Sequence, residues 1–142
     1  MSALVGAWTL ARWDATLDGQ PNGFPFGERA QGFLLYAADG WMSATLMRPG
    51  RAPLAHANFA SGTDAEKARA AEGYVAYRGR WTLDGTTVRH AVQASLLPNW
   101  IGATLVREAA FQPDGKLLLT TPPERTRAGR EVVNRLLWER AS

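Results

Sequence analysis

Residues 88–102 read VRHAVQASLLPNWIG, and this stretch holds both the pattern and the interruption on which the fold prediction rests. Its first half alternates like a β-strand, with His90 in phase with Val88 and Val92. Because strand side chains alternate between faces, we expect the imidazole on the apolar side of this strand. Pro98 has no N–H for a strand ladder, so it predicts a corner before the next strand.

The same alternation recurs along the chain between turn residues such as Asp39-Gly40 and Asp84-Gly85. A capping-box pattern, Thr63-Asp64-Ala65-Glu66, predicts one short surface helix between the third and fourth strands. Eight sequential strands with tight turns favour an all-β, up-and-down antiparallel barrel, with a two-sheet sandwich as the alternative. The strands are predicted over residues 3–15, 32–37, 41–47, 74–83, 86–96, 101–111, 116–121 and 131–140.

The composition limits the class of protein. A chain of 142 residues with 46% apolar and 20% charged residues predicts one folded domain over 1–142 rather than disorder. There is no cysteine, which excludes disulfides and thiolate metal sites. The net charge of +3 is scattered, so we expect no nucleic-acid partner. No apolar run approaches the ~20 residues of a membrane span, and we expect a cytoplasmic protein without a membrane partner.

Both ends of the chain carry residues suited to closing a barrel. The first strand contains Val5-Gly6-Ala7-Trp8, and the last contains Trp138-Glu139-Arg140. If these strands pair, Arg140 lies over the face of Trp8, a cation–π contact of about 1 kcal/mol. This arrangement resembles the calycin signature, in which an arginine of the last strand covers a Gly-x-Trp of the first.

A wider resemblance covers the chain from about Leu4 to Arg140. The blocks FPFGERAQGFLLYAADGWMSATLMRPGR, YVAYRGRW, VRHAVQASLLPNWIGATLVRE and LLWER resemble, in order and spacing, the bacterial and fungal lipocalin-like domain family. The resemblance implies a calycin-type barrel with a histidine at position 90. Related calycin barrels carry apolar ligands, and some barrel proteins of similar shape catalyse cyclisations in natural-product pathways.

Three polar side chains fall on predicted inward faces and are the candidate catalytic or ligand-anchoring groups: His90, Arg107 and Tyr77. An inward histidine is an acid/base candidate, or else a core residue bonded to a tyrosine or serine. An inward arginine binds a ligand oxygen, unless it points outward or pairs with Glu108 or Glu139. Tyr77 donates to a ligand carbonyl or packs with its hydroxyl satisfied.

A second set of residues is expected to line a ligand pocket. Trp100 follows the proline corner, where it stacks on a ligand or closes the barrel. Trp41 shares one face of its strand with Ser43 and Thr45, and the sequence leaves open whether that face is the inner one. The candidate ligand-binding residues are Tyr36, Trp81, Asn99, Trp100 and Trp41.

Two functions from different classes fit this pattern. The first is binding of a small apolar or aromatic molecule, such as a polyketide, terpenoid or fatty acid, in the barrel cavity. The second is a cofactor-free isomerase or cyclase, with His90 as acid/base and Arg107 or Tyr77 stabilising an oxyanion. We expect no cofactor and no metal site, since the chain has only two histidines and no cysteine. The apolar loops that carry Phe24 and Phe59 are candidates for a lid or a homodimer contact.

Overall fold

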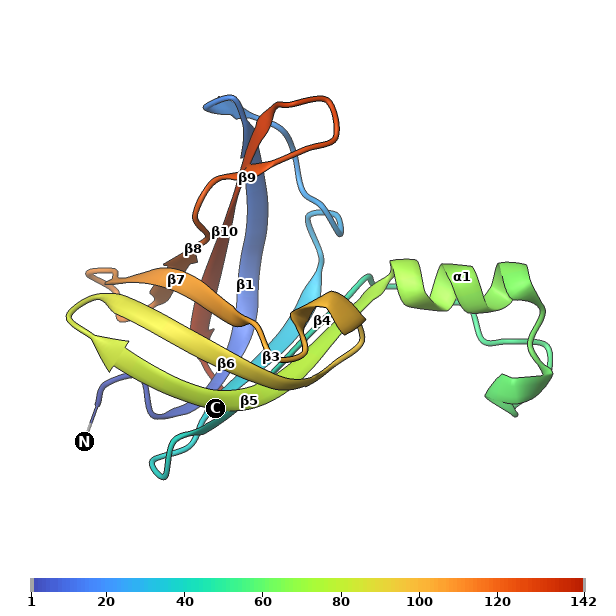
Figure 1. The fold of residues 1–142 in the computed structure, drawn as a ribbon, viewed down its shortest axis with the longest axis horizontal. Coiled ribbons are helices and arrows are strands. Elements are labelled where there is room, and N and C mark those ends of the chain that lie inside the picture. Colours follow the sequence, from blue (N-terminus) through green and yellow to red (C-terminus); the bar gives the residue numbers. More distant parts are fainter. Residues whose placement is uncertain (1, 142) are drawn as a thin grey trace.

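The computed structural model describes residues 2–141, so the two terminal residues of the predicted 1–142 domain lie outside it. The chain forms an antiparallel barrel, which Figure 1 shows with its first and last long strands side by side. The helix is α1 Asp64–Glu72, and Phe59–Ser61 and Pro98–Trp100 form 3₁₀ turns. The strands are β1 Gly6–Leu17, β2 Gln20–Pro21, β3 Gln31–Tyr36, β4 Trp41–Met47, β5 Tyr74–Asp84, β6 Thr87–Ser95, β7 Thr104–Phe111, β8 Leu117–Thr120, β9 Glu124–Arg125 and β10 Glu131–Arg140.

Eight long strands close the barrel in the order β1-β3-β4-β5-β6-β7-β8-β10, and β10 pairs back onto β1. The prediction of an eight-stranded closed barrel is therefore confirmed, and the sandwich alternative is wrong because no open edge separates two sheets. The two-residue strands β2 and β9 were not predicted. The helix lies between β4 and β5, whereas we predicted it between the third and fourth strands. The numbers differ by one because the unpredicted strand β2 comes before them.

The proline corner delays the strand that follows it. We predicted this strand from residue 101, but β7 begins at Thr104. Pro98–Trp100 forms a 3₁₀ turn, and Gly102 then takes a φ of 83°, a left-handed conformation that favours glycine. The turn leaves the chain aligned antiparallel to β6, so that His90 pairs with Leu105.

The register of β4 decides which of its faces is inside. Met42, Ala44 and Leu46 are buried, whereas Trp41 is 40% exposed. The face of β4 that carries Met42, Ala44 and Leu46 is therefore the inner one, and it packs in a core that also contains Trp8. This answers the question that the sequence left open.

Arg140 closes one end of the barrel. Its guanidinium carbon lies 4.0 Å from the centroid of the Trp8 ring, and the guanidinium donates hydrogen bonds to the carbonyls of Val5 and Ala3. Gly6 has a φ of 133°, and a Cβ there would lie 2.6 Å from Arg140 Nη1. A glycine at this position therefore permits the close approach of the arginine.

The helix α1 projects away from the barrel, as Figure 1 shows. Thr63 caps it, because its side chain accepts from the Glu66 N–H while Glu66 accepts from the Thr63 N–H. None of its residues is buried. The helix thus contributes little to the core, and the cavity is formed by the strands.

Candidate functional site: a cavity inside the barrel

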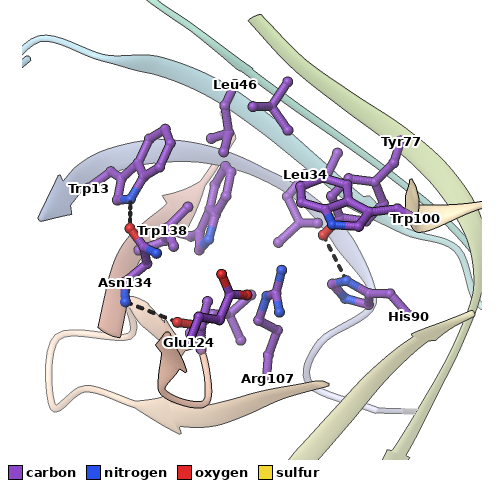
Figure 2. Close-up of a pocket in the computed structure, with 15 residues that line it drawn as sticks. Trp13, Leu34, Leu46, Tyr77, His90, Trp100, Arg107, Glu124, Asn134 and Trp138 are labelled. Carbon is purple, nitrogen blue, oxygen red and sulfur yellow. Dashed lines mark hydrogen bonds between the residues drawn. The ribbon is translucent and has the colours of Figure 1, made fainter. Parts of the chain in front are cut away.

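A cavity of about 180 Å³ lies within the barrel, and Figure 2 shows its lining. The lining includes three tryptophans, Trp13, Trp100 and Trp138. His90 and Arg107 face the same space from neighbouring strands β6 and β7. The cavity is thus aromatic on several walls and polar on one, the combination typical of small-molecule sites.

His90 is held at both ring nitrogens by tyrosine hydroxyls. Its Nε2 lies 2.7 Å from the Tyr36 oxygen, and its Nδ1 lies 2.9 Å from the Tyr77 oxygen. The side chain is 1% exposed. Burial, with a further contribution from the Arg107 charge, lowers the pKa of His90 to about 3. The imidazole is therefore neutral at physiological pH, with one nitrogen protonated and the other an acceptor.

Both tyrosines keep their protons. Burial raises the pKa of Tyr36 well above its ordinary value, and the proximity of Tyr77 raises it further. Burial also raises the pKa of Tyr77, although the Arg107 charge opposes this shift. Tyr36 comes from β3 and Tyr77 from β5, so the register of three strands assembles the group around His90.

Arg107 is half-buried at the cavity wall. One guanidinium nitrogen donates to the backbone carbonyl of Val106, 2.9 Å away. Among residues 2–141, no carboxylate lies within ion-pair distance of it, so neither the Glu108 nor the Glu139 alternative occurs. The remaining N–H groups of Arg107 face the cavity in Figure 2.

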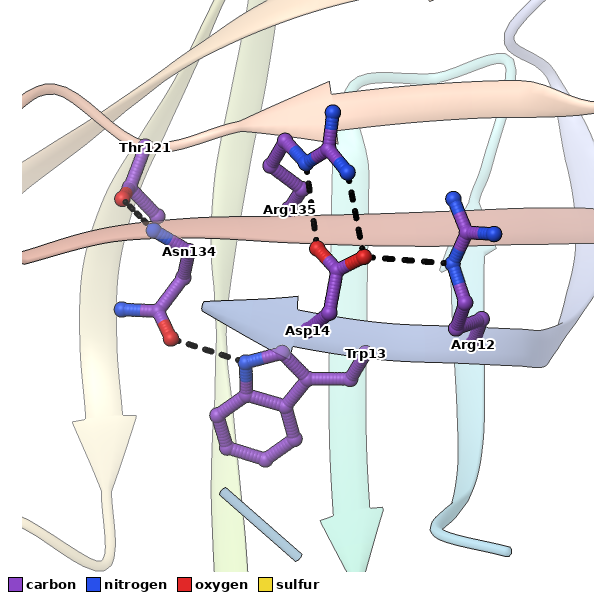
Figure 3. Close-up of polar contacts among 6 residues, drawn as sticks. All are labelled: Arg12, Trp13, Asp14, Thr121, Asn134 and Arg135. Atoms are coloured by element: carbon purple, nitrogen blue, oxygen red, sulfur yellow. Dashed lines mark hydrogen bonds and ion pairs between the residues drawn. The ribbon is translucent and has the colours of Figure 1, made fainter. Parts of the chain in front are cut away.

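A second polar cluster lies on the wall formed by β1 and β10. The indole nitrogen of Trp13 donates to Asn134 Oδ1 at 2.8 Å, and the Asn134 backbone N–H donates to Thr121 Oγ1 at 2.9 Å (Figure 3). On the outer face of the same strands, Arg135 makes two hydrogen bonds to Asp14. The Trp13 indole N–H and the Asn134 side-chain oxygen are thus paired with each other at the cavity wall.

Trp138 is one of the cavity residues that the sequence analysis did not single out as ligand contacts. It is 2% exposed, lines the cavity, and its Nε1 has no hydrogen-bond partner among the described residues. The sequence could have indicated this, because Trp138 lies two positions after Leu136 on β10 and both side chains face inward. Trp13, Glu124 and Asn134 also line the cavity without having been predicted.

The candidate ligand-binding residues divide into three groups. Trp100 lines the cavity and packs edge-on against Tyr77, with ring centroids 5.5 Å apart. Tyr36 and Trp81 are not in the lining: the Tyr36 hydroxyl contacts His90 Nε2, and the half-buried Trp81 packs against Tyr36 and donates to the Ala37 carbonyl. Trp41 and Asn99 lie outside the lining: Trp41 faces outward under Arg80, and Asn99 is exposed in the 3₁₀ turn.

Residues 5–141 match the sequence pattern of the lipocalin-like domain. The chain belongs to the lipocalin-like domain family. It is similar to the 4'-hydroxy-3'-methoxypropiophenone carrier protein ppsC of Aspergillus oryzae, with 41% identity over 90 residues that cover 58% of this chain and 81% of that protein. A crystal structure of an uncharacterized Bacteroides eggerthii protein matches 94% of this lipocalin-like barrel and 98% of its own chain, with 14% identity and a TM-score of 0.42.

The described part of this lipocalin-like chain contains no helix with the length and apolar character needed to cross a membrane.

Proposed function

We propose that this lipocalin-like barrel binds a small, single-ring aromatic molecule in its central cavity. The observation that carries the proposal is the cavity itself, which is lined by three tryptophans and holds the buried His90 and the half-buried Arg107 at one wall. Aromatic walls bury the ring, and a few placed polar groups orient it.

The volume narrows the ligand class. A cavity of about 180 Å³ is smaller than the roughly 300–1,000 Å³ of pockets for drug-sized ligands. An apolar cavity of about 150 Å³ is large enough for benzene. We therefore favour a substituted benzene over the longer polyketide, terpenoid or fatty-acid chains that the sequence pattern also allowed.

The similarity to the Aspergillus oryzae carrier supports the same class. That protein is named for 4'-hydroxy-3'-methoxypropiophenone, a single aromatic ring with a ketone. Identity of 41% over 90 residues makes a related ligand a reasonable first probe for this chain.

The state of His90 favours binding over acid–base catalysis. A pKa of about 3 makes the imidazole a weak base near neutral pH, and both ring nitrogens already have tyrosine partners. The isomerase or cyclase hypothesis needs a group poised near the working pH, and His90 does not provide one. Binding, and not turnover, is accordingly the function that we propose.

Isothermal titration calorimetry with 4'-hydroxy-3'-methoxypropiophenone tests the proposal. We expect saturable one-site binding to the wild-type chain, and quenching of tryptophan fluorescence over the same concentrations. Ala44→Phe adds a ring to the buried face of β4 that lines the cavity, and should abolish binding while the circular dichroism spectrum stays that of a folded barrel. Ser43→Phe, on the opposite face of β4, is the control. Equal affinity in Ala44→Phe and wild type would place the ligand elsewhere and overturn the proposal.

A further inference from the structure

The hydrogen bonds around His90 have a defined direction. Tyr36 is 0% exposed, is absent from the cavity lining, and has His90 Nε2 as the partner of its hydroxyl. If Nε2 carried the proton, the Tyr36 O–H would be a buried donor without an acceptor, at a cost of about 1–3 kcal/mol. Tyr36 therefore donates to Nε2, and the proton of the neutral imidazole is on Nδ1.

The direction at Tyr77 follows from that at Tyr36. His90 Nδ1–H donates to the Tyr77 oxygen, so the Tyr77 hydroxyl proton is left for another acceptor. Tyr77 lines the cavity, and no described residue accepts a hydrogen bond from its hydroxyl in this arrangement. Its free donor is therefore available to a molecule inside the barrel.

Two further donors face the same space. Trp138 Nε1–H is buried and has no partner among residues 2–141. Arg107 retains N–H groups beyond the one that binds Val106, and Figure 2 shows its guanidinium and the Trp138 indole reaching into the cavity from different strands. A buried donor without a partner is costly, so a ligand oxygen that satisfies these groups gains affinity.

The acceptors in the lining are largely occupied or exposed. Asn134 Oδ1 accepts from Trp13, and Thr121 Oγ1 accepts from the Asn134 backbone. Glu124 also lines the cavity, but it is an exposed residue of β9. The buried part of the cavity thus offers donors in excess of acceptors.

We propose that Tyr36 and His90 aim the Tyr77 proton into the cavity, and that Tyr77 O–H and Trp138 Nε1–H bind the carbonyl oxygen of an aromatic ketone. His90 and Tyr36 are positioning residues, since they act through Tyr77. Arg107 adds a positive charge that strengthens the interaction with a partly negative oxygen. A carbonyl oxygen fits because it accepts two hydrogen bonds and brings no proton of its own. This inference rests on the proposed function and names the ligand group that the site recognises.

The direction of the hydrogen bonds from Tyr36 through His90 to Tyr77 is tested without a ligand. Nitrogen-15 NMR of the full chain, labelled at histidine, distinguishes a protonated from an unprotonated ring nitrogen. We expect Nδ1 protonated and Nε2 unprotonated at His90, with the signals assigned by their persistence in His56→Ala. A His90 ring protonated at Nε2 would overturn the proposal, because Tyr77 would then donate to Nδ1.

The ligand contact is tested by infrared difference spectroscopy of 4'-hydroxy-3'-methoxypropiophenone labelled with ¹³C at the ketone. Binding should lower the carbonyl stretching frequency below its value in cyclohexane, since hydrogen bonds weaken the C=O bond. Tyr77→Phe and Trp138→Phe should each raise the frequency part of the way back and weaken binding about five- to tenfold, as expected for one net hydrogen bond. Trp41→Phe is the control, because Trp41 lies on the outer surface under Arg80 and outside the cavity lining.

The outcomes separate the two proposals. A ligand that binds wild type with an unshifted carbonyl band, or with a shift that both variants retain, overturns the carbonyl assignment and leaves the binding function standing. A wild-type chain that does not bind the ketone overturns both.

Discussion

The guanidinium of Arg140 lies over the ring of Trp8, with its central carbon 4.0 Å from the ring centroid. The two residues come from the last and first long strands and are paired in the β1–β10 register. Arg140 also donates to two backbone carbonyls of residues 3–5. One side chain thus ties the N-terminal segment, β1 and β10 together at the closed end of the barrel.

Arg140→Met should destabilise the barrel. It removes a cation–π contact of about 1 kcal/mol and two charge-assisted hydrogen bonds at a solvent-exposed site, and we expect a loss of roughly 1–3 kcal/mol. Urea unfolding measures the change. Arg89→Met is the matched control, since Arg89 is exposed on β6. Equal losses in the two variants would show that Arg140 has no special role in closure.

The close approach of β5 and β6 requires a glycine at position 79. A Cβ at this position would lie 1.9 Å from the Ala91 carbonyl oxygen, at the bulge where the β5–β6 register shifts. Gly79→Ala should force β5 and β6 apart, lower the free energy of unfolding by about 3 kcal/mol or more, and disturb the Tyr77–His90 contact. Chemical denaturation and the histidine NMR signals report the two effects.

Gly73→Ala is the control for that substitution. Its nearest contacts would be at 3.6 Å, an ordinary van der Waals distance, and its φ is −99°. A change of less than about 1 kcal/mol is expected. A barrel that tolerates Ala at position 79 as well as at position 73 would contradict the geometry of the bulge.

Stability should fall with acid because of His90. The pKa is about 3 in the folded chain and 6.5 for an unperturbed histidine, so between these values the unfolded state binds more protons. The stability that comes from keeping His90 neutral is fully present above about pH 6.5 and is lost as the pH falls toward 3. Over that range the free energy of unfolding changes by up to about 1.4 kcal/mol per pH unit. Denaturant unfolding between about pH 5 and pH 6.5 isolates this slope, since most carboxylates titrate lower.

His90→Phe should flatten that slope, even though its absolute stability falls because Tyr36 and Tyr77 lose their partner. His56→Ala is the matched control, because it removes the other histidine of the chain, which is exposed in a loop. A pH profile that is unchanged in His90→Phe would mean that another group causes the acid sensitivity.

Trp100→Ala should weaken ligand binding more than Trp41→Ala. Trp100 lines the cavity and packs edge-on against Tyr77, whereas Trp41 lies on the outer surface under Arg80. Loss of the Trp100 ring removes ligand contact area and support for Tyr77, and we expect an increase in Kd of tenfold or more, about 1.4 kcal/mol. Calorimetry with the propiophenone compares the two variants, and the opposite ranking would place the ligand outside the barrel.

The local sequence determined the strands and the single helix. Alternation gave the bounds of β4 and β10, and the Thr63 capping box gave the start of α1, because these signals depend on neighbours within a few residues. The Gly-x-Trp and the C-terminal arginine also indicated which strands close the barrel. The strands β2 and β9 were not predicted, since a two-residue strand is too short to show an alternating pattern.

Tertiary structure decided the site. Alternation states which residues share a face, but the inner face of β4 is set by its pairing with β3 and β5. The two partners of His90 lie 54 and 13 positions away in the chain, and only the register of the closed barrel brings them to opposite ring nitrogens. The free N–H of Trp138 is likewise a property of its surroundings. A residue's type fixes what it can donate or accept, whereas the folded barrel fixes which of those groups remains unpaired.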